Sequence, residues 1–300
     1  MSNNTETISK GKVKDLVITS ALYVLAIGVA IVVGYFLYDY IPNSLLLILV
    51  TDVIATLIIF IASTIFKNTS LYDPYWSVIP IFIAIYLFIQ GGLSEVLGPT
   101  QVVVFAVVGV WGLRLTYNWI RSWEGLKHED WRYAKYRAEK PKLFWFINLT
   151  GLQLMPTLLV FLGCIPLLPA FTYEIKMINI FFIIGVIITF GAIFIETLAD
   201  EQQYIFRQKK QPGELLDTGL WRSSRHPNYF GEVSFWWGIY FLGLAGNTAY
   251  WWAIAGPIAI SILFLVVSIP LMENRLKQRY PKYEEYQKRV SRLIPWFKKK

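Results

Sequence analysis

The chain alternates between long apolar runs and shorter polar segments. An apolar run of roughly 20 residues is long enough to cross a bilayer as a helix. We identify eight such runs, at about 16–40, 44–66, 76–90, 100–120, 144–169, 177–199, 229–246 and 250–272. The third run is short, as in a tilted or partly re-entrant helix. The pattern predicts an all-α polytopic membrane protein, a helical bundle of about seven or eight transmembrane helices.

The polar segments predict a single membrane domain. Residues 1–15 read as a polar N-terminal tail, and residues 16–300 contain no Pro/Gly/Ser-rich linker, low-complexity tract or internal repeat. We expect no cleaved signal peptide, because the first apolar run is too long for a signal sequence and lacks a small-residue cleavage pattern.

Composition supports a membrane protein and argues against metal chemistry. The 300 residues are 55% hydrophobic and 17% aromatic, and this apolar share is above the globular average. The single cysteine, Cys164, lies in an apolar run, and the only histidines are His128 and His226. We therefore expect no disulfide and no metal site.

The formal net charge of +8 is distributed as a topology signal. All but two of the 28 Lys and Arg residues fall in alternate polar segments, and the exceptions are Arg114 and Lys176. This positive-inside bias predicts that both termini are cytoplasmic. We expect contacts with bilayer lipids and no nucleic-acid partner.

Ionisable residues at membrane depth cost about 2.5–3.5 kcal/mol each and indicate function. Here they are Asp52, Arg114, Glu196 and Glu232, with Asp200 and Glu273 near a boundary. Helical spacing arranges polar residues in three stripes, which are Glu196, Asp200, Gln203 and Arg207; Arg114, Tyr117, Asn118 and Arg121; and Asn228 and Glu232. Either Arg114 neutralises Glu196 or Glu232 between packed helices, or the stripes form a polar ligand site. We favour the ligand site.

The segment "GLWRSSRHPNYFGE" (219–232) places cations at the start of an apolar run. Pro227 suits the first turn of a helix. Arg222, Arg225 and His226 would then precede a helix N-terminus, where arginines and free N–H groups bind phosphate or carboxylate. Binding of anionic lipid head groups is the alternative, but it leaves Glu232 unexplained. Because no G-x-G-x-x-G or Walker sequence is present, helices and loops would have to hold a nucleotide.

These residues resemble the steroid 5-alpha-reductase family, most closely its bacterial-type uncharacterised branch. The resemblance extends from about residue 52 to the C-terminus. It rests on "LYDPYWSVIP", "VWGLRLTYNWIRSW", "HEDWRY", "ETLADEQQYIFR", "PGELLDTGLWRSSRHPNYFGE", "PLMENRL" and "YPKYEEYQKRVSRLIPW". The "RHPNYFGE" element is shared with sterol reductases and isoprenylcysteine carboxyl methyltransferases, whereas "DPYW" and "ETLADEQ" are typical of the reductases.

The resemblance implies a membrane oxidoreductase that uses NADPH to reduce a carbon–carbon double bond conjugated to a carbonyl. The implied substrate is a lipid-like small molecule, such as a 3-oxo-Δ4 steroid, that enters from the membrane. The cofactor-binding part would cover about 196–300. Together with the polar stripes, the resemblance predicts these cofactor-binding residues: Arg114, Asp200, Gln203, Arg207, Trp221, Arg222, Arg225, His226, Asn228, Tyr229, Glu232, Glu273 and Arg275.

The catalytic side of the resemblance departs from the animal steroid enzymes. Hydride addition to an enone leaves charge on the carbonyl oxygen, which needs a donor within about 3 Å. Where those enzymes use a glutamate and a tyrosine, this chain reads "DPYW". The candidate catalytic residues are Asp73 and Tyr75 first, then Trp76, Tyr117 and Glu196. This departure leaves steroid specificity open.

Two other functions fit the same residues. One is an S-adenosylmethionine-dependent methyltransferase of a lipid or prenylated substrate, against which the "DPYW" segment and the extra early helices argue. The other is a non-enzymatic lipid-binding protein. We expect the bacterial cytoplasmic membrane as the location, with the endoplasmic reticulum as the alternative. The sequence leaves the oligomeric state open.

Overall fold

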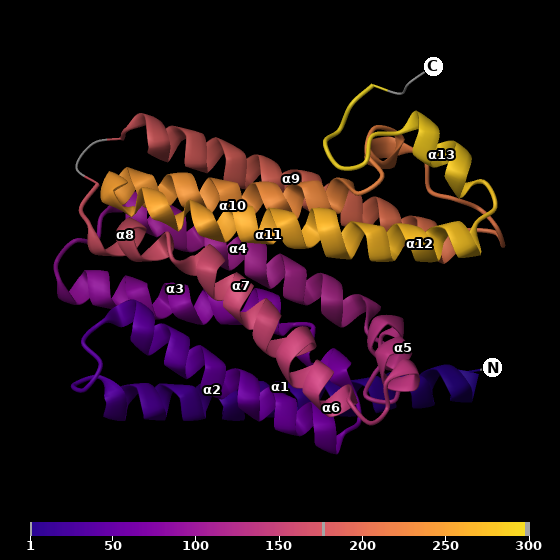
Figure 1. Ribbon diagram of the computed structural model, residues 1–300, viewed down its shortest axis with the longest axis horizontal. Coiled ribbons are helices and arrows are strands. Elements are labelled where there is room, and N and C mark those ends of the chain that lie inside the picture. Colours follow the sequence, from indigo (N-terminus) through magenta and orange to yellow (C-terminus); the bar gives the residue numbers. More distant parts are fainter. Residues whose placement is uncertain (1, 176–177, 298–300) are drawn as a thin grey trace. The chain divides into compact units, whose positions relative to one another are not determined.

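The computed structural model describes residues 2–175 and 178–297 and is built from helices (Figure 1). Within these residues no β-strand forms, and extended backbone pairs in an isolated bridge between Ser224 and Ser291. The predicted all-α class is confirmed.

Seven helices of the described chain are long and apolar enough to cross a membrane, which confirms a multi-pass membrane protein. They are Gly11–Leu37, Ser44–Ile65, Thr69–Leu93, Pro99–Ser122, Phe144–Thr172, Ile180–Lys209 and Thr248–Arg279. The third, predicted to be short, has 25 residues because η1 precedes it, which is sufficient to span a bilayer.

The predicted run 229–246 corresponds to α10 (Pro227–Gly246), a helix that is mostly enclosed by protein. Thirteen of its positions are buried, including Gly231, Glu232 and Trp236. Because other helices cover it, α10 carries glycine, tryptophan and a carboxylate in place of the aliphatic residues that face lipid.

The chain forms two compact units. Unit 1 contains Met1–Ile85 and Val108–Phe161, and unit 2 contains Tyr86–Val107 and Leu162–Lys300. Helices α3 (Tyr75–Leu93), α4 (Pro99–Ser122) and α7 (Met155–Cys164) contribute to both. The other elements of unit 1 are α1 (Ser2–Leu37), α2 (Ser44–Ile65), η1 (Thr69–Tyr72), α5 (Trp131–Glu139), α6 (Phe144–Ile147) and the π-helix η2 (Asn148–Leu154).

Unit 2 is organised around the antiparallel neighbours α9 (Ile180–Lys209) and α10, which run beside each other in Figure 1. Its other elements are α8 (Leu167–Thr172), the 3₁₀ helices η3 (Gly219–Arg222) and η4 (Thr248–Ile254), α11 (Ala255–Ile262), the π-helix η5 (Leu263–Ser268), α12 (Ile269–Arg279) and α13 (Tyr283–Arg289).

Local sequence sets where several helices begin. Asn43, Asn68, Asp130 and Asn179 cap α2, η1, α5 and α9, respectively, because each side chain accepts a hydrogen bond from a backbone N–H of the first turn. Pro227 occupies the first turn of α10, where its missing N–H costs nothing. The predicted start of this helix is confirmed.

Glycines allow α9 and α10 to pack closely. A Cβ at Gly238 would meet the Thr189 side chain and lie 3.0 Å from the Thr189 backbone nitrogen, and a Cβ at Gly185 would lie 2.7 Å from Leu242 Cγ. Gly191 on α9 has open space around it.

We predict opposite effects for two Gly→Ala substitutions in this pair. Gly238→Ala should destabilise the protein by about 1–3 kcal/mol, because the added methyl group overpacks the helix contact. Gly191→Ala should raise stability by about 0.5–1 kcal/mol through helix propensity. Thermal unfolding in detergent measures both, and equal midpoints for the two variants would contradict the close packing.

Candidate functional site

A buried ionic cluster holds the start of α10 in unit 2. It consists of Arg225, His226, Glu273 and Gln287, which we call the Glu273 cluster. The Glu273 carboxylate accepts a hydrogen bond from Arg225 Nε at 2.7 Å and from Gln287 Nε2 at 2.9 Å, and it lies 3.2 Å from His226 Nε2. The Arg225 and Glu273 side chains are only 10% and 11% exposed, so this is a largely desolvated ion pair.

Arg225 also binds the C-terminal part of the chain. Its Nη1 donates to the carbonyl oxygens of Gln287 at 2.6 Å and Val290 at 3.0 Å. These bonds and the Glu273 pair direct the guanidinium towards protein groups, which gives Arg225 a structural role that the sequence did not predict. Arg207 and Arg222, by contrast, are exposed. Phosphate binding by any of the three arginines stays a prediction.

His226 links the Glu273 cluster to two aromatic side chains. Its ring stacks on Tyr229, with centroids 5.4 Å apart and planes at 8°, and Tyr229 in turn packs against Phe264 at 4.9 Å. Burial lowers the pKa of His226 below its ordinary value, although the bond to Glu273 opposes this shift. Burial therefore favours the neutral form of the His226 ring.

The polar stripes on α9 and α10 meet in unit 2. Asn228 Nδ2 donates to Asp200 Oδ1 at 3.3 Å, and Asp200 is buried. Glu232, one turn further along α10, accepts a hydrogen bond from Trp236 Nε1 at 2.9 Å. Two predicted cofactor residues, Asn228 and Asp200, are therefore in contact.

Two further contacts fix the 3₁₀ helix η3 to α9. Trp221 Nε1 donates to Ala199 O at 3.1 Å, and Leu220 N–H donates to Gln202 Oε1 at 2.9 Å. Sequence reasoning selected Gln203 from the helical spacing and missed Gln202, whose amide faces η3. Its position next to Gln203 carried no signal of this contact.

In unit 1, Tyr75 belongs to a buried polar centre with a partner that the sequence did not assign. Its hydroxyl donates to Asp52 Oδ1 at 2.7 Å, and its ring stacks on Tyr72 at 4.9 Å and 18°. Asp52 is 5% exposed, and within the described part of the chain its Oδ2 has no hydrogen-bond partner. The depth of Asp52 in the second apolar run was the available signal, but nothing in the sequence linked it to Tyr75.

Hydroxyl groups extend this centre. The Tyr72 hydroxyl lies 2.7 Å from Thr157 Oγ1, which lies 2.8 Å from Thr56 Oγ1. Helices α2 and α7 and the 3₁₀ helix η1 are thereby joined through polar contacts that a bilayer cannot supply.

Asp73, the other first-choice catalytic residue, points to a different set of partners. It accepts the Tyr133 hydroxyl at 2.6 Å and lies 3.9 Å from Arg132 Nη2. Burial and the Asp73 carboxylate raise the pKa of Tyr133 far above its ordinary value. Asp73 thus ties the start of α3 to α5, and its catalytic role stays a prediction.

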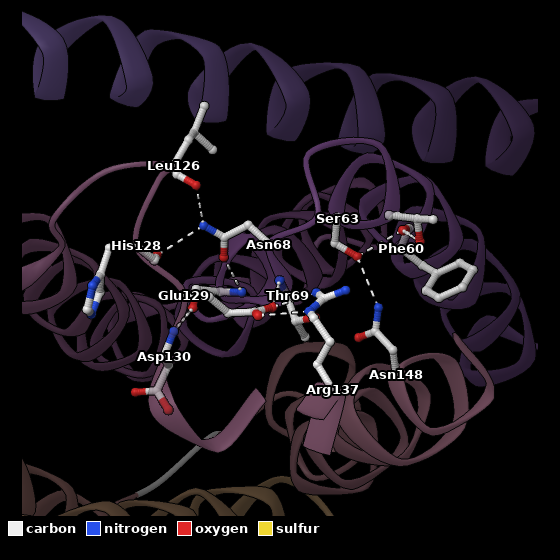
Figure 2. Close-up of polar contacts among 12 residues, drawn as sticks. Phe60, Ser63, Asn68, Thr69, Leu126, His128, Glu129, Asp130, Arg137 and Asn148 are labelled. Atoms are coloured by element: carbon white, nitrogen blue, oxygen red, sulfur yellow. Dashed lines mark hydrogen bonds and ion pairs between the residues drawn. The ribbon is translucent and has the colours of Figure 1, made fainter. Parts of the chain in front are cut away.

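The "HEDW" segment is held by the turn before η1 (Figure 2). Asn68 Nδ2 donates to Leu126 O at 2.7 Å and to His128 O at 3.0 Å. Glu129 accepts the Thr69 N–H at 2.8 Å and pairs with Arg137 at 2.7 Å. This motif therefore has an architectural role, in which it fixes the loop that leads into α3.

The remaining predicted residues are divided between the units. Tyr117 on α4 is exposed. The Arg121 guanidinium carbon lies over the Tyr117 ring, 5.7 Å from the ring centroid. Of the catalytic candidates, Asp73, Tyr75, Trp76 and Tyr117 lie in unit 1 and Glu196 lies in unit 2. Of the cofactor candidates, Arg114 lies in unit 1 and the others lie in unit 2. A single site formed by both groups stays a prediction.

Fold and site together define a polytopic helical membrane protein with buried polar centres in both units. Residues 59–290 match the family model described as "Protein of unknown function (DUF1295)", and the chain belongs to this family. It is also 25% identical over 256 residues to the uncharacterized protein C594.04c of Schizosaccharomyces pombe, in an alignment that covers 76% of this chain and 73% of the relative. No solved structure matches.

We predict that stability falls in acid because of His226. Its folded pKa lies below the unfolded value of about 6.5, so the unfolded state binds the proton more readily. The contribution is complete above about pH 6.5 and is lost as the pH falls through the folded pKa. As the pH is lowered from about 6.5, the thermal midpoint of His226→Gln should fall less steeply than that of the wild type. His128 is exposed, so His128→Gln should follow the wild type. An unchanged slope for His226→Gln would contradict this origin.

Glu273→Gln should destabilise the protein by about 3 kcal/mol, because Arg225 would lose its carboxylate partner. This value is at the low end for a broken buried ion pair, since both side chains of the pair are slightly exposed. Glu139→Gln is the matched control. Glu139 lies 3.9 Å from Lys135 on the surface, so its loss should cost at most about 1 kcal/mol. Denaturation in detergent compares them, and similar losses would show that the Glu273 cluster is not a stability determinant.

Proposed function

We propose that this protein is a membrane reductase that uses NADPH to reduce the conjugated double bond of a lipid enone. The observation that carries the proposal is the contact between the Asp52 carboxyl and the Tyr75 hydroxyl at 2.7 Å, buried in unit 1, with the second Asp52 oxygen unsatisfied. Buried polar groups normally find partners. An unsatisfied oxygen within a membrane helix therefore suggests a group kept for a ligand.

The chemistry of the pair suits stabilisation of an enolate. When a hydride reaches the β-carbon of an enone, the electron pair of the double bond moves and negative charge develops on the carbonyl oxygen. The Tyr75 hydroxyl, whose one proton is donated to Asp52 in this structure, would turn to that oxygen when a substrate binds, and the low dielectric of the site strengthens the interaction. The α-carbon then takes up one proton from solvent water as the carbonyl re-forms, so that one hydride and one proton together saturate the double bond.

The residues of unit 2 suit a dinucleotide. The Asn228 amide and the Asp200 carboxylate offer donors and acceptors for ribose hydroxyls or a carboxamide, and the exposed Arg207 and Arg222 offer guanidinium groups for phosphates. NADPH would supply the hydride. The resemblance to the steroid 5-alpha-reductase family in "RHPNYFGE" and "ETLADEQ" supports this cofactor.

The proposal therefore assigns cofactor binding to Asn228, Asp200, Arg207 and Arg222, and stabilisation of the carbonyl oxygen to Tyr75 with Asp52. The substrate is apolar, because the chain around both polar centres is a multi-pass helical membrane protein. The bacterial cytoplasmic membrane is the proposed location.

Two variants test the two assignments separately. In purified full-length protein, Asn228→Ala should weaken NADPH binding about tenfold or more, because Asp200 would be left without this donor. Tyr75→Phe should keep NADPH affinity and lower turnover of an enone about a hundredfold, because a donor to the developing charge is lost. Calorimetry measures binding, and NADPH absorbance measures turnover on a panel of lipid enones.

The controls are Asn274→Ala, an exposed asparagine on α12, and Tyr35→Phe, an exposed tyrosine on α1, and both should behave as wild type. Thermal stabilisation by S-adenosylmethionine but not by NADPH would instead support the methyltransferase. Failure of both ligands would favour a non-enzymatic lipid-binding protein.

A further inference from the structure

The chain after α13 folds back onto unit 2. We call residues 290–297 the C-terminal strap, and Figure 1 shows it turning back after α13. Backbone and side-chain hydrogen bonds join it to the segment before α10: Arg225 N–H to Ser291 O at 2.9 Å, the Ser224 hydroxyl to Leu293 O at 2.6 Å, and Trp296 N–H to Ser223 O at 3.0 Å. The strap therefore has a fixed position in unit 2.

Arg292 fixes the strap to a membrane-spanning helix. Its Nη2 donates to Leu265 O at 2.8 Å, and Leu265 lies in the π-helix η5 within the span Thr248–Arg279. In a π-helix each carbonyl accepts from the N–H five residues later, as Phe264 O does from Ile269 N–H. The next donor in this register would be Pro270, which has no N–H. Arg292 supplies the missing donor.

This contact sets the depth of the strap. The apolar part of the span ends at Glu273, and about 12 Å of helix separate Glu273 from Leu265 at 1.5 Å per residue. Because half of the hydrocarbon core is about 15 Å thick, Leu265 lies well inside the apolar part of the span, and the long Arg292 side chain reaches it from the strap. The strap therefore returns from the polar end of α12 and packs beside the apolar part of the span.

The outer side of the strap is apolar and is followed by cations. Ile294, Trp296 and Phe297 are 62%, 67% and 86% exposed, although they belong to the most basic segment of the chain. In the sequence they are followed directly by Lys298, Lys299 and Lys300. Exposed aromatic side chains beside basic residues are typical of protein segments at a membrane interface.

We propose that the C-terminal strap is a membrane-surface anchor that binds anionic phospholipid. Ile294, Trp296 and Phe297 insert between the head groups of the leaflet on the basic side of the protein. The lysines that end the sequence attract the anionic head groups, whose surface potential favours basic residues within a Debye length. The anchor does not depend on the proposed reductase function.

Because Cys164 is the only cysteine and is buried, a label can be placed at a single site. In a Cys164→Ala parent with unchanged helical content, Phe297→Cys carries an environment-sensitive fluorophore. Glu284→Cys is the control, since Glu284 on α13 is exposed and precedes the strap. Each protein is reconstituted at one copy per nanodisc, and in a parallel series at two copies, in phosphatidylcholine alone or with phosphatidylglycerol. Quenching is measured with iodide in water and with a phospholipid that carries a doxyl group near its head group.

In anionic discs we expect iodide quenching at position 297 to be at least about threefold weaker than at position 284, and lipid quenching to be correspondingly stronger. Neutral lipid, high salt, or Lys298→Gln, Lys299→Gln and Lys300→Gln together should each reduce the difference. Equal iodide quenching at both positions would overturn the anchor. Lipid quenching that is the same in neutral and anionic lipid and at low and high salt would overturn the binding of anionic lipid. Protection of position 297 from iodide only in discs with two copies would assign the surface to a protein contact.

Discussion

The structure of unit 2 depends on neutralising one buried carboxylate at the edge of the membrane. Glu273 receives hydrogen bonds from Arg225 and Gln287 and contacts His226. A charge that is removed from water without partners costs several kcal/mol, so these groups must stay together once the helices pack. This requirement joins the start of α10, the end of α12 and helix α13, and it orders the segment from which the C-terminal strap continues.

The same constraint acts in unit 1 with different groups. The hydroxyl groups of Tyr72, Tyr75 and Thr157, which are buried, form hydrogen bonds with one another, with Thr56 or with Asp52. Among the described residues, the second oxygen of Asp52 is one of several buried polar atoms without a hydrogen-bond partner, and the proposed chemistry begins there because it lies beside Tyr75. The two units thus combine polar contacts that are architectural with a smaller number that suit a ligand.

The residues of the motifs that resemble the reductases also divide into those that hold the fold and those that suit a ligand. In "RHPNYFGE", Arg225 and His226 serve the Glu273 cluster, whereas Asn228 contacts Asp200. In "HEDW", Glu129 accepts a hydrogen bond from the Thr69 N–H and the Asp130 N–H donates to Ser70 Oγ, so the motif holds η1, which leads into α3. Membership of the DUF1295 family is thus compatible with motif residues that preserve the fold as well as with residues that bind a substrate.

The sequence by itself determined the helices that cross the membrane, because bilayer thickness fixes the length of an apolar run and capping residues such as Asn43 and Pro227 act locally. It also located the polar residues at membrane depth. Only the tertiary structure decided their partners. Tyr75 meets Asp52, Arg225 meets Glu273, and Arg292 replaces a donor that Pro270 lacks. Such pairs form between different helices or segments, and their contacts depend on how each element is rotated and packed, which the pattern along one helix does not specify.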